Sequence, residues 1–146
     1  MPRWLQVLLG VVAIGILTVI ILAFVGYRWV RRNRGQIQAQ MRELTSQGTA
    51  YGSGKDVTAC MDESVRFYEA HGKNFKARLT TQIWMESCVR ASTVSAEFCA
   101  KAPRPTEFIK GAQWAVDECA KRGLGTDQGC RNFMLVAPRA CETKRE

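Results

Sequence analysis

The sequence has few of the residues that build metal and catalytic sites. His71 is its only histidine, and no two cysteines have the C-x-x-C spacing of zinc sites and thiol oxidoreductases. It also lacks a C-x-x-C-H haem-attachment motif, and the GSGK stretch at 52–55 lacks the strand and helix context of a phosphate-binding loop. We therefore expect a protein that is not an enzyme, with no cofactor, no metal site and no small-molecule substrate.

Acidic residues are nearly absent from the first 54 positions. This segment holds six Lys or Arg and one acidic residue, Glu43, a balance of +5 within the chain's formal net charge of +8. The remaining residues are closer to balance, with fifteen basic and twelve acidic side chains. A nucleic-acid-binding domain would carry a basic stripe on its folded part. The charge distribution therefore argues against a nucleic-acid partner and favours proximity to lipid head groups.

One long apolar run stands near the N-terminus. From Val7 to Val25 the only polar side chain is Thr18, and an α-helix of this length covers roughly the ~30 Å of a bilayer's hydrocarbon. Trp4 precedes the run, and Tyr27 and Trp29 follow it, where aromatic rings suit the two membrane interfaces. No A-x-A-like cleavage site follows, so we expect a retained single transmembrane helix rather than a signal peptide.

Two features disagree about which side of the membrane the rest of the chain occupies. The positive-inside bias of the arginines after the run would keep the C-terminal part in the cytoplasm, whereas six cysteines in one small domain indicate disulfides and an oxidising compartment. We give the cysteines more weight and predict a bacterial inner-membrane protein with a periplasmic domain. The alternatives are a mitochondrial inner-membrane protein facing the intermembrane space, or a cytoplasmic domain. In the favoured topology, anionic phospholipid head groups contact four arginines: Arg28, Arg31, Arg32 and Arg34.

The predicted fold class is all-α, with one N-terminal transmembrane helix followed by a small disulfide-stapled helical domain. Residues 1–30 form the anchor with its basic flank, and residues 31–54 form a juxtamembrane stalk that ends in a flexible Gly-rich linker at 47–54. Residues 55–146 form the cysteine-rich domain, in which no strand pattern is convincing.

Apolar periodicity in this domain predicts four helices and one short helical turn. The helices cover about 57–71 and 74–91, then 105–123 with Pro105 in the first turn, and a last segment from Thr126 to just before Pro138; the turn covers 95–102. The side chains predicted to face inward are Val57, Met61, Val65 and Tyr68, then Phe75, Leu79, Ile83, Trp84 and Cys88, then Phe108, Ala112, Ala115, Val116 and Cys119, and finally Cys130, Phe133, Met134 and Ala137.

The cysteine spacing suggests how the disulfides form. In two similar stretches a tryptophan precedes a cysteine by four or five residues, and the next cysteine follows eleven residues later. Ser95 and Thr126 could each cap the helix that carries the second cysteine. This pattern predicts the pairs Cys88–Cys99 and Cys119–Cys130, which leaves Cys60 with Cys141. The main alternative joins two antiparallel helices through Cys60–Cys88, because six cysteines allow fifteen pairings.

Without a catalytic constellation, a binding or structural function is favoured. The leading hypothesis is a non-enzymatic accessory subunit of a larger membrane complex, of a respiratory or photosynthetic kind, whose partners are other integral membrane subunits and phospholipid. The first alternative is a membrane-tethered receptor or adaptor for a peptide, lipid or cell-wall ligand, with Trp84 and Trp114 as candidate partner contacts in one groove. The second alternative is a thiol-redox protein with a labile cysteine pair.

Overall fold

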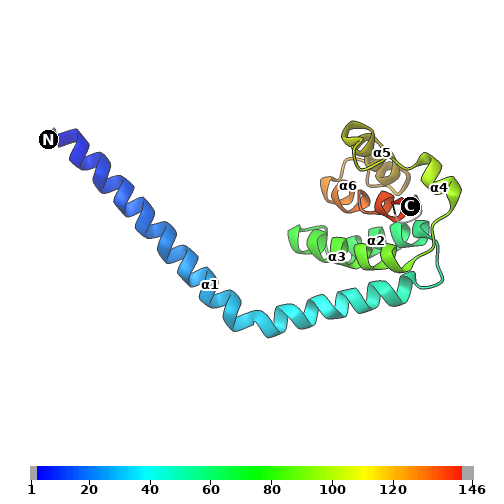
Figure 1. The fold of residues 1–146 in the computed structure, drawn as a ribbon, viewed down its shortest axis with the longest axis horizontal. Coiled ribbons are helices and arrows are strands. Elements are labelled where there is room, and N and C mark those ends of the chain that lie inside the picture. Colours follow the sequence, from blue (N-terminus) through cyan, green and yellow to red (C-terminus); the bar gives the residue numbers. More distant parts are fainter. Residues whose placement is uncertain (1–2, 143–146) are drawn as a thin grey trace. The chain divides into compact units, whose positions relative to one another are not determined.

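The computed structural model describes residues 3–142 of the chain, and the regular elements within this range are helices. In order, they are α1 (Arg3–Gly52), α2 (Val57–Ala70), α3 (Phe75–Ala91), α4 (Ala96–Lys101), α5 (Phe108–Lys121), α6 (Gln128–Met134) and the 3-10 turn η1 (Ala137–Cys141), as Figure 1 shows. This confirms the all-α fold class. The chain divides into two compact units, the first ending at Gln40 and the second beginning at Met41.

The first unit is the apolar part of α1. Its large side chains are open to solvent along the helix: Ile14 is 67%, Leu22 67% and Phe24 61% exposed. The Thr18 hydroxyl donates to the Ile14 carbonyl at 2.9 Å, so the polar side chain of the run needs no other partner. This helix is long and apolar enough to cross a membrane, which supports a membrane anchor. The side chains at 7–9, with which the predicted span begins, lie outside the described residues.

The end of α1 belongs to the second unit, and the predicted flexible linker at 47–54 is wrong. The helix continues to Gly52, and Gly48 and Gly52 are buried one turn apart. A Cβ atom on Gly48 would overlap the Trp84 carbonyl oxygen and lie 3.0 Å from the Ser87 Cβ, and one on Gly52 would overlap the Cys88 carbonyl oxygen. These glycines therefore let two helix backbones approach closely, which is a packing function and not flexibility.

Helices α2 and α3 form the centre of the domain and have well-defined starts. The Asp56 carboxylate accepts from the Thr58 amide at 2.9 Å, and the Asn74 side chain accepts from the Ala77 amide at 2.9 Å. These N-caps satisfy amides that have no partner within the helix. Between the two helices the chain turns at Gly72, whose φ of 83° lies in the left-handed region that glycine adopts without strain.

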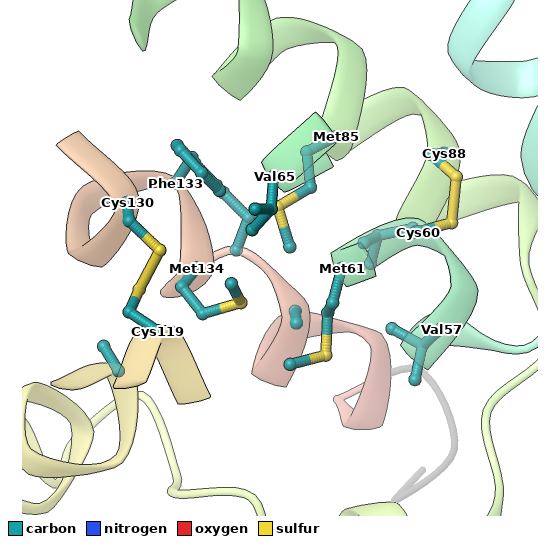
Figure 2. Close-up of a cluster of buried hydrophobic side chains, with 14 of the residues drawn as sticks. Val57, Cys60, Met61, Val65, Met85, Cys88, Cys119, Cys130, Phe133 and Met134 are labelled. Carbon is teal, nitrogen blue, oxygen red and sulfur yellow. A yellow bond between two sulfur atoms is a disulfide. The ribbon is translucent and has the colours of Figure 1, made fainter. Parts of the chain in front are cut away.

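The core lies between α2, α3, α6 and η1. The predicted stripe of α2 is confirmed, since Val57, Met61, Val65 and Tyr68 are all buried. Figure 2 shows Met61, Val65, Met85, Phe133 and Met134 gathered between the helices that carry them.

For α3 the predicted inward face is partly wrong. Trp84 and Cys88 are buried, but Phe75 is 70% and Leu79 50% exposed. The buried positions in this part of the helix are instead Ala77 and Thr81. Here the small side chains of Ala77 and Thr81 face the core, and the apolar pattern of the sequence does not predict this.

Helices α5 and α6 both begin later in the sequence than predicted. Pro105 lies in the loop before α5, which begins at Phe108, and the Glu107 carboxylate accepts from the Arg104 amide at 3.0 Å within that loop. The N-cap of α6 is Asp127 and not Thr126: its carboxylate accepts from the Cys130 amide at 2.8 Å. In the short element α4, the predicted cap Ser95 is confirmed.

Three disulfides connect these helices, and two of the three predicted pairs are wrong. The bonds are Cys60–Cys88, Cys99–Cys141 and Cys119–Cys130; only the last of the preferred pairs is correct, and the alternative Cys60–Cys88 replaces the predicted Cys88–Cys99. Figure 2 shows how Cys60–Cys88 joins the facing sides of α2 and α3. Cys88 lies on the buried face of α3, and Cys60 lies on the neighbouring helix α2. The packing of these two helices, and not proximity along the chain, therefore decides the partner of Cys88.

Candidate interaction surface

The cysteines form a framework that is buried except at Cys99. All six are disulfide-bonded, and Cys60, Cys88, Cys119 and Cys130 have no exposed surface. Cys141 is 2% exposed, and Cys99 is half-buried. Exchange requires a thiolate to reach a disulfide sulfur, so this burial protects the bonds. Among the described residues, no group of three or more His, Cys, Asp or Glu side chains could hold a metal ion.

The two tryptophans singled out by the sequence lie in different environments. Trp84 is 4% exposed, with its ring centroid 5.4 Å from Tyr51 and 5.9 Å from Phe67. It therefore acts as a core residue beneath the end of α1. Trp114 is half-buried and packs edge-on against Phe98 at 6.2 Å.

The remaining sequence candidates lie on the surface. Arg28, Arg31, Arg32 and Arg34 are all exposed on α1, and head-group contact by them stays a prediction. His71 caps the end of α2, where its ring stacks on Phe67 at 4.1 Å and its Nδ1 lies 2.7 Å from the Phe67 carbonyl oxygen. These contacts describe a helix-terminal residue.

An ion-pair network joins α5 to α2. The Arg122 guanidinium donates to the Asp62 carboxylate at 2.7 Å and to the Glu118 carboxylate at 2.7 Å, and Lys121 also pairs with Glu118. Burial opposes ionisation of Glu118, but the hydrogen bonds from Lys121 and Arg122 outweigh it and lower the pKa of this carboxyl. The network therefore stabilises the contact between two helices when Glu118 is ionised.

A groove lies between α5 and α6, and no pattern in the sequence predicts it. It has a volume of about 690 Å³, and its lining includes Phe108, which is 82% exposed, Ile109, which is 87% exposed, and Leu135, which is 41% exposed. Phe108 and Ala112 were predicted to face inward, and both are exposed. Ala115 and Cys119 were also predicted to face inward, and both are confirmed as buried, together with Gly111.

The two helices that form this groove run in opposite directions. Cys119, near the end of α5, is bonded to Cys130, near the start of α6, while a Cβ on Gly111 would lie 3.6 Å from Leu135 Cδ2 at the other end. Each helix contributes side chains at helical spacing to the groove. From α5 these are Ile109, Ala112, Gln113 and Val116, and from α6 and its C-cap they are Gln128, Arg131, Asn132 and Leu135.

Arg131 is the charged side chain in the lining of this groove. Its Nε atom is enclosed by the protein and has no hydrogen-bond partner there. An enclosed donor without a partner is unfavourable, because the water it loses is not replaced. The groove thus combines exposed apolar side chains with one cationic group whose hydrogen bonding is incomplete.

Comparison with protein-family models, with curated proteins and with solved structures found no match for this chain. The site therefore has to be interpreted from its own geometry and chemistry.

Proposed function

We propose that this protein is a non-enzymatic, single-pass accessory subunit of a larger membrane complex, with its disulfide-bonded domain on the oxidising side. The observation that carries this proposal is the exposed apolar surface beside the α5–α6 groove, where Phe108 and Ile109 are more exposed than the other large apolar side chains described in the domain. Exposed Phe and Ile side chains next to a hollow are typical of a contact with another macromolecule.

The apolar helix supports the membrane part of the proposal. Its described large side chains are exposed, so lipid or other membrane helices would cover them. The three disulfides support an oxidising compartment, and the bacterial periplasm is the compartment we propose. In that topology the four arginines after the span meet phospholipid head groups on the outer face.

The two alternatives have less support. A receptor groove built on Trp84 and Trp114 would need both rings to be available, yet Trp84 is 4% exposed in the core. A thiol-redox protein would need an accessible, labile pair, yet two of the three disulfides are fully enclosed.

The test is extraction of the full-length protein from its native membranes in mild detergent, followed by affinity purification and size analysis. We expect other integral membrane proteins to co-purify in stoichiometric amounts. Recovery as a lone monomer, under conditions in which known complexes of the same membrane stay intact, would contradict the proposal.

A further inference from the structure

The α5–α6 groove has the shape that receives a third helix. Two antiparallel helices each present side chains at i, i+3, i+4 and i+7 toward it, and such ridges and grooves are the surfaces into which another helix packs. The α5 side of the groove extends from Phe108 to Val116, which corresponds to about 12 Å along the helix axis. A partner helix of two to three turns would therefore cover it.

The charge of the groove specifies the partner further. Arg131 lines it without a hydrogen bond at its enclosed Nε atom, and the remaining polar lining is neutral: Gln113, Gln128 and Asn132. Because Arg131 is the only charged side chain among the lining residues, a carboxylate on the incoming helix would complement it, and charge-assisted bonds are about twice as strong as neutral ones. The flanking apolar surface of Phe108, Ile109 and Leu135 would then bury against apolar side chains of the same helix.

Two other occupants fit this surface less well. A symmetric pair formed by a second copy through this groove would place two copies of Arg131 in one interface with no acidic side chain among the lining residues to pair with them. A bilayer surface has no ridge to fill a concave groove, and its hydrocarbon would leave Arg131 without a partner.

We propose that the α5–α6 groove binds an amphipathic helix from another subunit, with apolar residues against Phe108, Ile109 and Leu135 and an Asp or Glu against Arg131. This helix-in-groove mode names the partner class for the accessory subunit, and it rests on the function proposed above.

The test uses the full-length protein in its native membranes, with the photo-crosslinking residue p-benzoylphenylalanine in place of Ile109. The matched control places the same residue at Ala100, which is an exposed position on α4 outside the groove. After mild extraction, the intact complex is irradiated and the crosslinked peptides are identified by mass spectrometry. We expect Ile109 to crosslink to one amphipathic, acid-containing segment of a co-purifying subunit, and Ala100 not to reach that segment.

Charge reversal then tests Arg131. Arg131→Glu should reduce the crosslink at least about tenfold, Arg131→Lys should retain most of it, and replacing the partner's acid by Lys should restore the crosslink to Arg131→Glu. If the circular dichroism of Arg131→Glu shows that it does not fold, Ile109→Asp with the crosslinker at Phe108 replaces it, because both side chains are over four-fifths exposed.

The outcomes separate the two proposals. A complex that remains intact, but in which Ile109 crosslinks to lipid, to a second copy, to a non-helical segment or to nothing, overturns the groove assignment alone. A crosslink that is insensitive to Arg131→Glu also overturns it. Recovery of the chain without other subunits contradicts the proposed function, and the groove assignment falls with it.

Discussion

Apolar side chains occupy opposite environments in the two units of this molecule. In the first part of α1, Leu22 is 67% and Phe24 61% exposed, whereas Phe133 and Met134 in the domain have no exposed surface. The domain buries a core of apolar side chains by itself, with three disulfides as covalent support, although Phe108 and Ile109 stay exposed. The described large side chains of the helix are exposed, and we propose that an external apolar phase covers them. The two units should therefore respond differently to the same perturbation.

Reduction of the disulfides should have the largest effect, and only on the domain. The sequence separations of 11, 28 and 42 residues correspond to about 3, 3.5 and 4 kcal/mol by the chain-entropy model, about 10 kcal/mol in total, which is comparable with the whole stability of a small domain. In lipid nanodiscs, we expect dithiothreitol to abolish the near-ultraviolet circular dichroism of the domain while α1 stays membrane-inserted. A fully reduced domain that keeps its near-ultraviolet spectrum would show that the disulfides are not needed for the folded state of the domain.

Matched Phe→Ala substitutions test the difference between covered and uncovered surface within the domain. Phe133→Ala should lower the free energy of unfolding by about 3–5 kcal/mol, because it leaves a cavity in the core. Phe108→Ala should change it by less than about 0.5 kcal/mol, because that side chain is 82% exposed in the free chain. Urea unfolding in mild detergent measures both. Equal effects would mean that Phe108 is covered by the chain itself, which would contradict the groove.

Glycine substitutions along α1 compare its two parts directly. Gly52→Ala should destabilise the domain by about 1–3 kcal/mol, because the added Cβ overlaps the Cys88 backbone. Gly35→Ala is the control: nothing lies within 4 Å of its Cβ position, so the higher helix propensity of Ala should make it neutral or stabilising by up to about 1 kcal/mol. The measurement is again urea unfolding. If Gly52→Ala is also neutral, the end of α1 does not pack on α3.

Acid should weaken the link between α5 and α2 by the smallest amount. The pKa of Glu118 is lower in the folded state, so its contribution is present above its unfolded-state pKa and is lost as pH falls through the folded-state value. Wild type should exceed Glu118→Gln in stability by up to about 1 kcal/mol at pH 7, and the difference should shrink at an acid pH at which the folded-state carboxyl becomes protonated. Urea unfolding at the two pH values checks this, and a difference that persists in acid would exclude ionisation as its cause.

Local patterns predicted most of the helices. The stripe Val57, Met61, Val65 and Tyr68 follows helical periodicity and is buried, and Ser95 caps α4 as its position before a short helix indicates. The pair Cys119–Cys130 was also predictable, because its cysteines lie at the two ends of one short connection.

The errors arise where long-range packing decides. Cys88 pairs across to α2 and not with Cys99, because the contact of α2 with α3 brings Cys60 beside it. The glycines at 48 and 52 resemble a linker in composition, but they serve a helix contact that only the partner backbone reveals.

The groove was missed for a related reason. Phe108 and Ala112 belong to an apolar stripe like any core stripe, and periodicity does not distinguish a face covered by the same chain from one left open to a partner. The enclosed Nε of Arg131, which marks the same surface, depends on tertiary structure and gives no signal in the sequence.

The most direct test of the anchored, disulfide-bonded architecture is non-reducing peptide mapping of the protein from its native membranes, with free thiols alkylated at lysis. Trypsin places each of the six cysteines on a separate peptide, so every pairing is distinguishable. The account predicts three linked peptide pairs, Cys60–Cys88, Cys99–Cys141 and Cys119–Cys130, with no alkylated cysteine in the membrane fraction. Alkylation of all six cysteines would place the domain in a reducing compartment and contradict the proposed side of the membrane.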